Sequence, residues 1–255
     1  TGRGFGPWGE NYDGTACAGN GNDCPETWDD DDDHGTHCAG IAGAVDDDDG
    51  VLGVATAPTL HAVRVLGCDG VGLFSDVAAG IEYTADRGWD VASLSLGASS
   101  GSETVRDACA YATDRGTVVV AAAGNDGPCA DCVAYPARYD SVIAVSATDD
   151  DDTLAGYSST GPEVDLAAPG TAIPSTVPGG IASFSGTSMA CPHVSGAASS
   201  TSGPVEEKSA RSSFESVADT AITRLSRAGK PTQSVQGPLL PAAAAITTPP
   251  SAADW

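Results

Sequence analysis

Basic residues are scarce in this sequence, and only two of them are lysines. There are 11 Lys and Arg against 35 Asp and Glu, which gives a formal net charge of −24. A surface this acidic repels nucleic acid and anionic membranes, so we expect neither as a partner. The excess lies in the aspartate runs Asp29–Asp33, Asp46–Asp49 and Asp149–Asp152. Such a surface repels itself unless salt screens it, which favours a halophilic protein over an acidic mesophilic one.

Long apolar runs are also lacking, and cysteine is sparse. No run approaches the roughly 20 apolar residues that span a bilayer. No secretory signal is recognisable, so we expect any such segment to be removed or to lie outside this chain. The eight cysteines are too few for a disulfide scaffold, but Cys17/Cys24 and Cys129/Cys132 lie in loops that suit short disulfides. A zinc site would need a second Cys-x-x-Cys pair. We therefore expect disulfides and a secreted, extracellular, monomeric protein.

Strand and helix signals alternate from residue 51 onward, in a chain long enough for one α/β domain. Residues 1–33 form no periodic pattern, so we interpret them as an irregular acidic loop region and expect the first central strand to be missing. Ser75 and Ser102 are placed to cap the two helices, and Gly88 and Gly116 to end them. The order predicts a parallel sheet with right-handed crossovers and helices on both faces. The expected strands are 60–66, 91–96, 117–123 and 141–147, and the expected helices are 75–87 and 102–116.

Three side chains could form a site for nucleophilic catalysis. Ser188 follows a Gly-Thr pair at the expected start of a helix, where small neighbours leave a hydroxyl accessible. Asn125 ends the most apolar strand, and its amide could stabilise an oxyanion, although a turn residue is the simpler interpretation of Asn125 alone. In His34-Gly-Thr-His37, one histidine suits a general base and the other a structural role, because the zinc-protease glutamate is lacking.

Four motifs occur together in the order His34-Gly-Thr-His-Cys-Ala-Gly, Ser95-Leu-Gly, Ala122-Ala-Gly-Asn125 and Gly186-Thr-Ser188-Met-Ala-Cys-Pro-His. Over about residues 30–198 the chain resembles the subtilisin-like serine proteases, or subtilases. The His-Cys-Ala-Gly variant is similar to the proteinase K branch, and the acidity is similar to that of the haloarchaeal halolysins. The resemblance implies a catalytic domain over 1–228 with a degenerate or disordered tail over 229–255.

The resemblance also implies a serine endopeptidase acting on polypeptide substrates. Ser188 would form the acyl-enzyme, His34 would be the general base, and Asn125 would help to bind the oxyanion. A substrate strand would add to Ser95, Leu96 and Gly97, while Ala122 and Gly124 would flank a roomy first specificity pocket that prefers large or apolar side chains. The chemistry would need no cofactor, although structural calcium is common in the family and no ligand can be named.

The sequence departs from the family pattern at two places. The family's Asp-Thr/Ser-Gly motif is not found, and we expect Thr1-Gly2 to be its tail; Asp13 and the run Asp29–Asp33 are weaker alternatives. After Ser188 the expected helix meets serines and Gly203-Pro204, which are poor helix formers, and a weak second helix follows over 205–228. We therefore expect a weakly stable domain, and a cooperative melt above about 60 °C in low salt would contradict this.

Two other functions remain open from the sequence. A subtilase impaired in catalysis could act as a peptide-binding module. A zinc-dependent hydrolase could use His34, His37 and Cys38. Cys38 and Cys191 lie in the motifs that contain His34 and Ser188, where buried free thiols are at least as reasonable as a bridge.

Overall fold

The computed structural model describes residues 2–4, 30, 32–47, 50–55, 57–67, 70–200 and 246–247. Its helices are α1 (His34–Gly43), α2 (Phe74–Asp86), α3 (Glu103–Asp114) and α4 (Thr187–Ser199). Its strands are β1 (Gly2–Gly4), β2 (Thr59–Leu60), β3 (Ala62–Arg64), β4 (Val91–Leu94), β5 (Val118–Ala122), β6 (Ile143–Thr148), β7 (Val164–Pro169), β8 (Ile173–Val177), β9 (Gly180–Phe184) and β10 (Ile246–Thr247).

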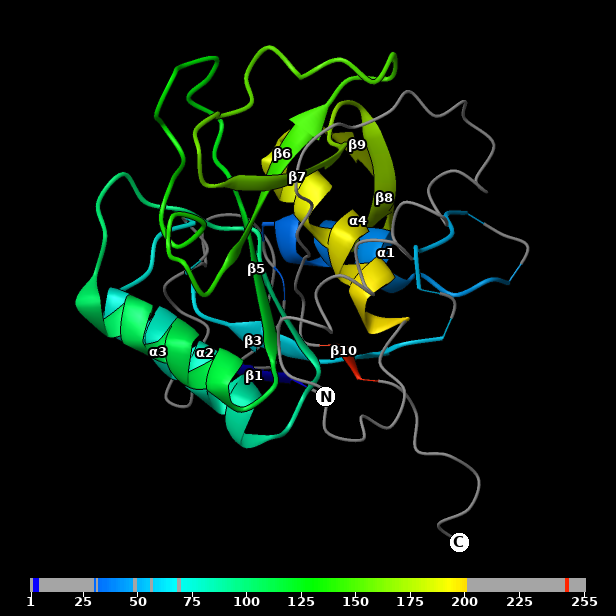
Figure 1. The fold of residues 1–255 in the computed structure, drawn as a ribbon. Helices are drawn as coiled ribbons and strands as arrows, with labels where there is room; N and C mark the ends of the chain where they lie inside the picture. The colour runs from blue at the N-terminus through cyan, green and yellow to red at the C-terminus, as the bar shows by residue number, and fades with distance from the viewer. Residues whose placement is uncertain are drawn as a thin grey trace, which may run out of the picture.

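A six-stranded sheet in the order β2-β10-β4-β5-β6-β7 forms the centre of the described part of the chain. Strands β4, β5, β6 and β7 pair in parallel, and β10 enters antiparallel between β2 and β4. Helices α2 and α3 lie side by side on one face, with α1 and α4 on the other (Figure 1). The α/β fold with a parallel sheet and helices on both faces, predicted from the sequence, is confirmed.

Strand β5 belongs to both hydrophobic cores. Val120 and Ala122 pack with α4 on one face, whereas Val119 and Ala121 pack with α2 and α3 on the other. Successive side chains of a strand point to opposite faces, so an uninterrupted apolar run is what a doubly covered strand requires. The end of this strand therefore has a rigid, buried base, and Gly124 and Asn125 follow directly after it.

The predicted N-terminus is correct for helix α3 and wrong for helix α2. Helix α3 has Ser102 as its N-cap residue and buries Val105, Ala108, Cys109 and Ala112, as the pattern predicts. Helix α2 begins earlier than predicted, with Leu73 at the N-cap position and Ser75 inside the first turn, so the proposed Ser75 cap is wrong. The Ser75 hydroxyl instead faces the Asp76 carboxylate at 3.4 Å.

The chain ends contain short strands that the sequence analysis did not anticipate. Gly2–Gly4 forms β1, parallel to β3, within the region interpreted as loop. Ile246–Thr247 forms β10 within the region interpreted as a degenerate or disordered tail. Strands of two or three residues contain too few side chains for a periodic pattern, so they cannot be recognised by alternation. The predicted strand 60–66 is likewise divided into β2 and β3.

Several predictions concern residues outside the described ranges, among them Asp13, the Cys17/Cys24 pair and the second helix over 205–228. Helix α4 runs for 13 residues and ends at Ser199 with Ser200 as its C-cap, where the serines were expected to interrupt it. In the part of the chain that the structure describes, no helix is both long and apolar enough to span a membrane.

Candidate active site

Ser188 is the second residue of α4, and its side chain is half-buried at the edge of a pocket. Its carbonyl oxygen accepts a hydrogen bond from Ser95 Oγ at 2.7 Å and a weaker one from Cys38 Sγ at 3.4 Å. Its own hydroxyl lies 3.5 Å from the Ser95 carbonyl oxygen. The backbone of Ser188 is therefore held from two sides. Among the described residues its hydroxyl has only one long contact, so it is available for chemistry.

The amide of Asn125 is oriented by Thr187, the residue before Ser188. Asn125 Oδ1 accepts hydrogen bonds from the Thr187 N–H at 2.9 Å and from Thr187 Oγ1 at 3.0 Å. Thr187 Oγ1 in turn accepts the Gly124 N–H at 3.1 Å. A backbone N–H can only donate, so the atom that faces it must be the amide oxygen. Among the described residues Asn125 Nδ2 has no acceptor, so it remains available as a donor.

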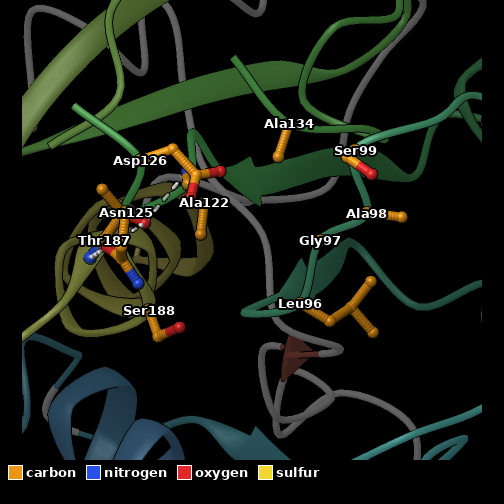
Figure 2. A pocket seen from close by; sticks show the side chains of 11 residues that line it. Leu96, Gly97, Ala98, Ser99, Ala122, Asn125, Asp126, Ala134, Thr187 and Ser188 are labelled. Atoms are coloured by element: carbon orange, nitrogen blue, oxygen red, sulfur yellow. Dashed lines mark hydrogen bonds between the residues drawn. The ribbon is translucent and has the colours of Figure 1, made fainter. Parts of the chain in front are cut away.

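Asn125 Nδ2 and the Ser188 nitrogen lie near one point beside Gly186. A β-carbon built on Gly186 would be 3.5 Å from Asn125 Nδ2 and 3.7 Å from both Asn125 Oδ1 and the Ser188 nitrogen. Two N–H donors this close to one point can together stabilise a developing oxyanion. Figure 2 shows Asn125 and Thr187 joined by hydrogen bonds on one side of the pocket, with Ser188 below them.

The pocket beside Ser188 has a volume of about 270 Å³. One wall is the segment after β4 and the other is the end of β5 with Ala134 (Figure 2). Gly97 and Gly124 face Ala134 across narrow gaps, since a β-carbon on either would lie 3.1 Å from Ala134 Cβ. Gly124 also has φ +107°, a conformation that L side chains rarely adopt. The lining residues are Leu96, Gly97, Ala98, Ser99, Ala122, Gly124, Asn125, Asp126, Ala134, Thr187 and Ser188.

The segment after β4 presents an unused backbone edge. Ala98 pairs with Tyr135 through hydrogen bonds of 2.8 and 2.9 Å, which fixes the segment on one side. The backbone groups of Gly97 have no hydrogen-bond partner among the residues that the structure describes. An extended peptide could therefore pair with Gly97 as an added strand beside the pocket. Leu96 and Gly97, expected to pair with a substrate strand, and Ala122 and Gly124, expected to flank the specificity pocket, all line this pocket. Ser95 donates to the Ser188 carbonyl.

His34 is the first residue of α1, the helix that packs against α4. Its ring is half-buried, and burial lowers the pKa of His34 although the nearby charges of Asp32 and Asp30 act to raise it. A lowered pKa keeps the imidazole neutral near pH 7, the form that a general base needs. Within the described residues no hydrogen bond joins His34 to Ser188, and such contacts are often long before a substrate binds.

Asp30, Asp32 and Asp33 do not orient the ring of His34. The Asp30 carboxylate accepts the backbone N–H groups of Thr36 and Asp32. Asp33 is the N-cap residue, with φ +64°. In the described ranges no carboxylate makes a hydrogen bond to His34, so neither Asp30, Asp32 nor Asp33 is placed as a triad aspartate.

The zinc hypothesis requires His34, His37 and Cys38 to converge, and they do not. His37 Nε2 faces the carbonyl oxygens of Ile173 and Ala182, while the Cys38 thiol points to the Ser188 carbonyl. Burial raises the pKa of the Cys38 thiol to about 12, so it stays protonated and is a poor metal ligand. Among the described residues no group of three or more His, Cys, Asp or Glu could hold a metal.

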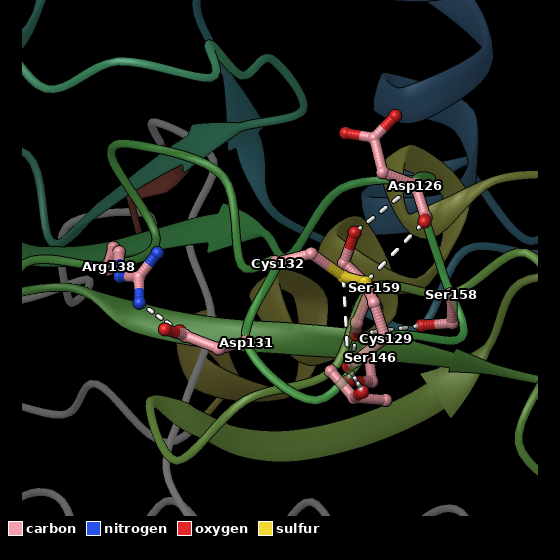
Figure 3. Close-up of a disulfide and its surroundings, with 9 residues drawn as sticks. Asp126, Cys129, Asp131, Cys132, Arg138, Ser146, Ser158 and Ser159 are labelled. Atoms are coloured by element: carbon pink, nitrogen blue, oxygen red, sulfur yellow. Dashed lines mark hydrogen bonds and ion pairs between the residues drawn. A yellow bond between two sulfur atoms is a disulfide. The ribbon is translucent and has the colours of Figure 1, made fainter.

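A disulfide between Cys129 and Cys132 closes the loop that leads from Asn125 to Ala134 (Figure 3). This loop is attached to the segment before β7: the Asp126 N–H donates to Ser159 Oγ at 3.1 Å and the Cys132 N–H to the Thr160 carbonyl at 3.0 Å. Cys38, Cys109 and Cys191 form no disulfide within the described part of the chain. The disulfide therefore lies in the middle of a loop whose two ends form pocket wall.

Replacing both Cys129 and Cys132 by serine is expected to lower the free energy of unfolding by about 2 kcal/mol. The loss comes from the entropy of an unfolded chain that is no longer closed over four residues. At about 2–4 °C per kcal/mol, the melting temperature should fall by about 4–8 °C, measured by calorimetry. A reductant should lower the melting temperature of the wild type more than that of the double variant, and equal shifts would contradict the prediction.

Five of the lining residues were not anticipated from the sequence: Ala98, Ser99, Asp126, Ala134 and Thr187. Thr187 orients Asn125, and Ala134 lies against Gly97 of one wall and Gly124 of the other. Thr187 belongs to the Gly-Thr-Ser motif, but the motif gives it no role. Its hydrogen bond to Asn125 joins residues 62 positions apart. No local pattern reports a contact at that separation.

Comparison with known proteins identifies one family. The model of the Subtilase family matches residues 10–230. Subtilisin BL from Lederbergia lenta is 50% identical over 166 residues, which cover 65% of this chain and 61% of that protein. Thermitase from Thermoactinomyces vulgaris is 51% identical over 167 residues, covering 65% of this chain and 59% of thermitase. These relatives support the family without supporting the proteinase K branch.

Solved structures give the same result for the fold. Sphericase superimposes with a TM-score of 0.62 and 38% sequence identity, covering 66% of this chain and 62% of the sphericase chain. S41 Psychrophilic Protease superimposes with a TM-score of 0.61 and 38% identity, covering 65% of this chain and 61% of that chain. The chain thus spans about six tenths of the length of the relatives that it matches.

Proposed function

This chain belongs to the subtilase family, and on that basis we propose that it is a serine endopeptidase that cleaves polypeptides through an acyl-enzyme on Ser188. The observation that carries the proposal is the arrangement at the start of α4. Ser188 has an accessible hydroxyl, its N–H and Asn125 Nδ2 converge beside it, and a pocket of about 270 Å³ opens there. This arrangement is what acyl transfer requires.

In the acylation step Ser188 Oγ attacks the carbonyl carbon of the scissile bond while His34 takes the hydroxyl proton. The carbonyl oxygen becomes an oxyanion, which accepts hydrogen bonds from Asn125 Nδ2 and the Ser188 N–H. When the C–N bond breaks, His34 gives its proton to the leaving amine. The result is an ester on Ser188 and a free amine product.

In the deacylation step a water molecule replaces the amine. His34 takes a proton from this water as its oxygen attacks the ester carbon, and the same two donors hold the second oxyanion. The C–O bond to Ser188 then breaks, His34 returns the proton to Ser188 Oγ, and a carboxylic acid product leaves. Every step uses one base and one oxyanion site, both supplied by this chain.

Covalent labelling with a fluorophosphonate tests the proposal. We expect one phosphonate per molecule, located on Ser188 by peptide mapping, because such probes react with serines that a base activates. The Ser188→Ala variant is the control and should remain unlabelled. A folded wild type that is not labelled overturns the endopeptidase proposal and leaves the peptide-binding module, whose groove beside Gly97 would still bind an extended peptide.

The substrate preference proposed here is for large or apolar side chains in the pocket. Small residues line the walls, and the Asp126 carboxylate would repel an acidic side chain. Support also comes from Gly97, whose unpaired backbone can hold the substrate as an added strand. Digestion of a peptide library would contradict this preference if cleavage clustered after Asp or Glu.

Halophily, export and a monomeric state are further parts of the proposal. The net charge of −24 supports a surface adapted to high salt, and the Cys129–Cys132 disulfide supports an oxidising, extracellular compartment. The melting temperature in low and in molar KCl tests the halophily, because salt that screens the repulsion between surface carboxylates should raise the melting temperature. The aspartate runs could supply carboxylates to structural calcium, but no ligand set is assigned because the described residues contain no such cluster.

A further inference from the structure

His37 is a fully buried imidazole that the mechanism does not use. It lies one turn after His34 in α1 and has no exposed surface. Its Nε2 atom is 3.0 Å from the Ile173 carbonyl oxygen and 3.2 Å from the Ala182 carbonyl oxygen. Carbonyl oxygens only accept hydrogen bonds, so Nε2 carries the proton and shares it between the two. Burial lowers the pKa of His37, so the ring stays neutral.

The two carbonyls belong to opposite strands of one hairpin. Ile173 begins β8 and Ala182 lies in β9, and these antiparallel strands pair Ile173 with Phe184 at the open end. The His37 ring also stacks on Phe184, with ring centroids 4.3 Å apart and an interplanar angle of 17°. One side chain of α1 therefore holds both strands of the β8–β9 hairpin together at that end.

Backbone contacts strengthen the same junction. Ser175 Oγ donates to the His37 carbonyl at 2.7 Å, and Thr176 Oγ1 donates to the Thr36 carbonyl at 3.2 Å. A β-carbon on Gly40 would lie 2.3 Å from both hydroxyl oxygens, so the hairpin rests directly on the backbone of α1. The first turn of α1, which includes His34, is thus bound to the hairpin rather than only packed near it.

The β8–β9 hairpin is followed closely in the chain by Ser188, the proposed nucleophile. Phe184 ends β9, and only Ser185, Gly186 and Thr187 separate it from Ser188. The connection is short and fixed, because the Gly186 N–H donates to the Gly170 carbonyl at 2.9 Å and Ser185 Oγ accepts the Ala172 N–H at 2.8 Å. The hairpin is therefore a second connection between α1 and Ser188, beside the direct contact of Cys38 Sγ with the Ser188 carbonyl at 3.4 Å, and its displacement would act on the separation of Ser188 and His34.

We infer that His37 is a positioning residue, which sets the distance between His34 and Ser188 by clamping α1 to the β8–β9 hairpin. The inference rests on the proposed function, since it concerns the transfer of a proton between these two side chains. Misplacement of a reacting group by about 1 Å can lower a rate about 100-fold. A clamp that is lost should therefore reduce kcat and leave KM nearly unchanged, because His37 does not line the pocket.

Two His37 variants separate the parts of the clamp. His37→Phe keeps an aromatic ring against Phe184 but has no N–H, and we expect kcat per active site to fall about 10- to 100-fold. His37→Gln keeps an N–H donor, and we expect it to recover part of this loss. The concentration of active sites is measured by fluorophosphonate labelling, and the rate is divided by this concentration. Molecules that fail to fold are not labelled and therefore do not lower the measured kcat.

A milder pair of variants covers the case in which His37→Phe does not fold. Ser175→Ala removes the 2.7 Å bond to the His37 carbonyl, and Thr117→Ala removes a similar buried bond of 2.8 Å to the Trp89 carbonyl, away from the pocket. Both should melt at lower temperature, but only Ser175→Ala should lower kcat per labelled site.

The outcomes are distinguishable. If labelled His37→Phe and Ser175→Ala keep the wild-type kcat and differ only in melting temperature, His37 is merely structural and the inference is overturned. A wild type that is never labelled overturns the proposed function, and this inference with it. A loss of kcat confined to the hairpin variants, with partial recovery in His37→Gln, supports the clamp.

Discussion

Replacing His34 by alanine is expected to lower kcat about 100-fold and to leave KM within a few-fold of the wild type. A subtilisin with its full triad loses about 10⁶-fold, but removing its aspartate alone already costs about 3 × 10⁴-fold, and the described residues place no carboxylate on His34, so about 100-fold remains for His34 to lose. KM should change little because His34 is not part of the pocket lining. Steady-state hydrolysis of a peptide substrate measures both constants.

The pH dependence of kcat/KM is a second test of His34 as the general base. The neutral imidazole is the reactive form, so activity should appear as the pH rises through the pKa of His34. Burial lowers this pKa below its usual 6.5, and the charges of Asp32 and Asp30 only partly oppose the shift. The acid limb of kcat/KM should therefore have its midpoint below pH 6.5, and activity should persist in mildly acidic solution.

A matched control uses another histidine. His61 lies between β2 and β3, and its ring stacks on Trp89 with centroids 3.9 Å apart. It is outside the pocket lining, so His61→Ala should keep the wild-type kcat and the same acid limb. A His34→Ala variant within about 10-fold of the wild type, or a control with an equal loss, would show that His34 is not the base.

Residues that lie near each other in sequence were the most predictable part of this protein. Helix α3 and its buried face were read from the spacing of Val105, Ala108 and Cys109, since a helix repeats its contacts every three or four residues. Strand β5 was read from an uninterrupted apolar run, because a strand covered on both faces has no polar side. These local patterns placed Asn125 directly after a buried strand.

Contacts between distant segments were not predictable from such patterns. The region from Val164 to Phe184, which contains β7, β8 and β9, received no prediction because exposed and buried positions alternate irregularly there. The clamp at His37 depends on that region and joins residues 136 and 145 positions apart. The motif with His34 marked His37 as structural, but only the fold shows which carbonyls it binds.

Four of the residues named from the sequence lie at one edge of the sheet for a physical reason. Leu96, Gly97, Ala122 and Gly124 all follow or end parallel strands, and the carboxyl ends of neighbouring parallel strands meet at one edge of a sheet. Ala134 comes from a loop, so no strand pattern placed it at the same edge. Its contribution became visible only where Gly97 and Gly124 approach it.

Replacing Asn125 by alanine is expected to lower kcat about 10²- to 10³-fold, with little change in KM. The range is that found for a subtilisin, so it comes from the same family. Asn125 Nδ2 donates to an oxyanion that exists only in the transition state, so its loss should spare substrate binding. Steady-state kinetics with active sites counted by labelling measures the effect, and a loss below about 10-fold would contradict the assignment.

Thr187 supplies the stricter test, because it acts on the oxyanion through Asn125. Thr187→Val removes the hydroxyl that donates to Asn125 Oδ1 and accepts the Gly124 N–H, so the amide loses one of its two fixed contacts. We expect kcat to fall about 10-fold, since the Thr187 N–H still holds the amide oxygen. Thr187→Ser keeps the hydroxyl and should stay near the wild type.

The double variant decides between positioning and direct action. If Thr187 only orients Asn125, adding Thr187→Val to Asn125→Ala should lower kcat no further, because there is no amide left to orient. Two losses that multiply would mean that the Thr187 hydroxyl stabilises the oxyanion independently. If the double variant has the same kcat as Asn125→Ala alone, Thr187 acts only by orienting the Asn125 amide. The hydrogen bonds from the Gly124 N–H to Thr187 Oγ1 and from Thr187 Oγ1 to Asn125 Oδ1 then fix the orientation of the oxyanion donor.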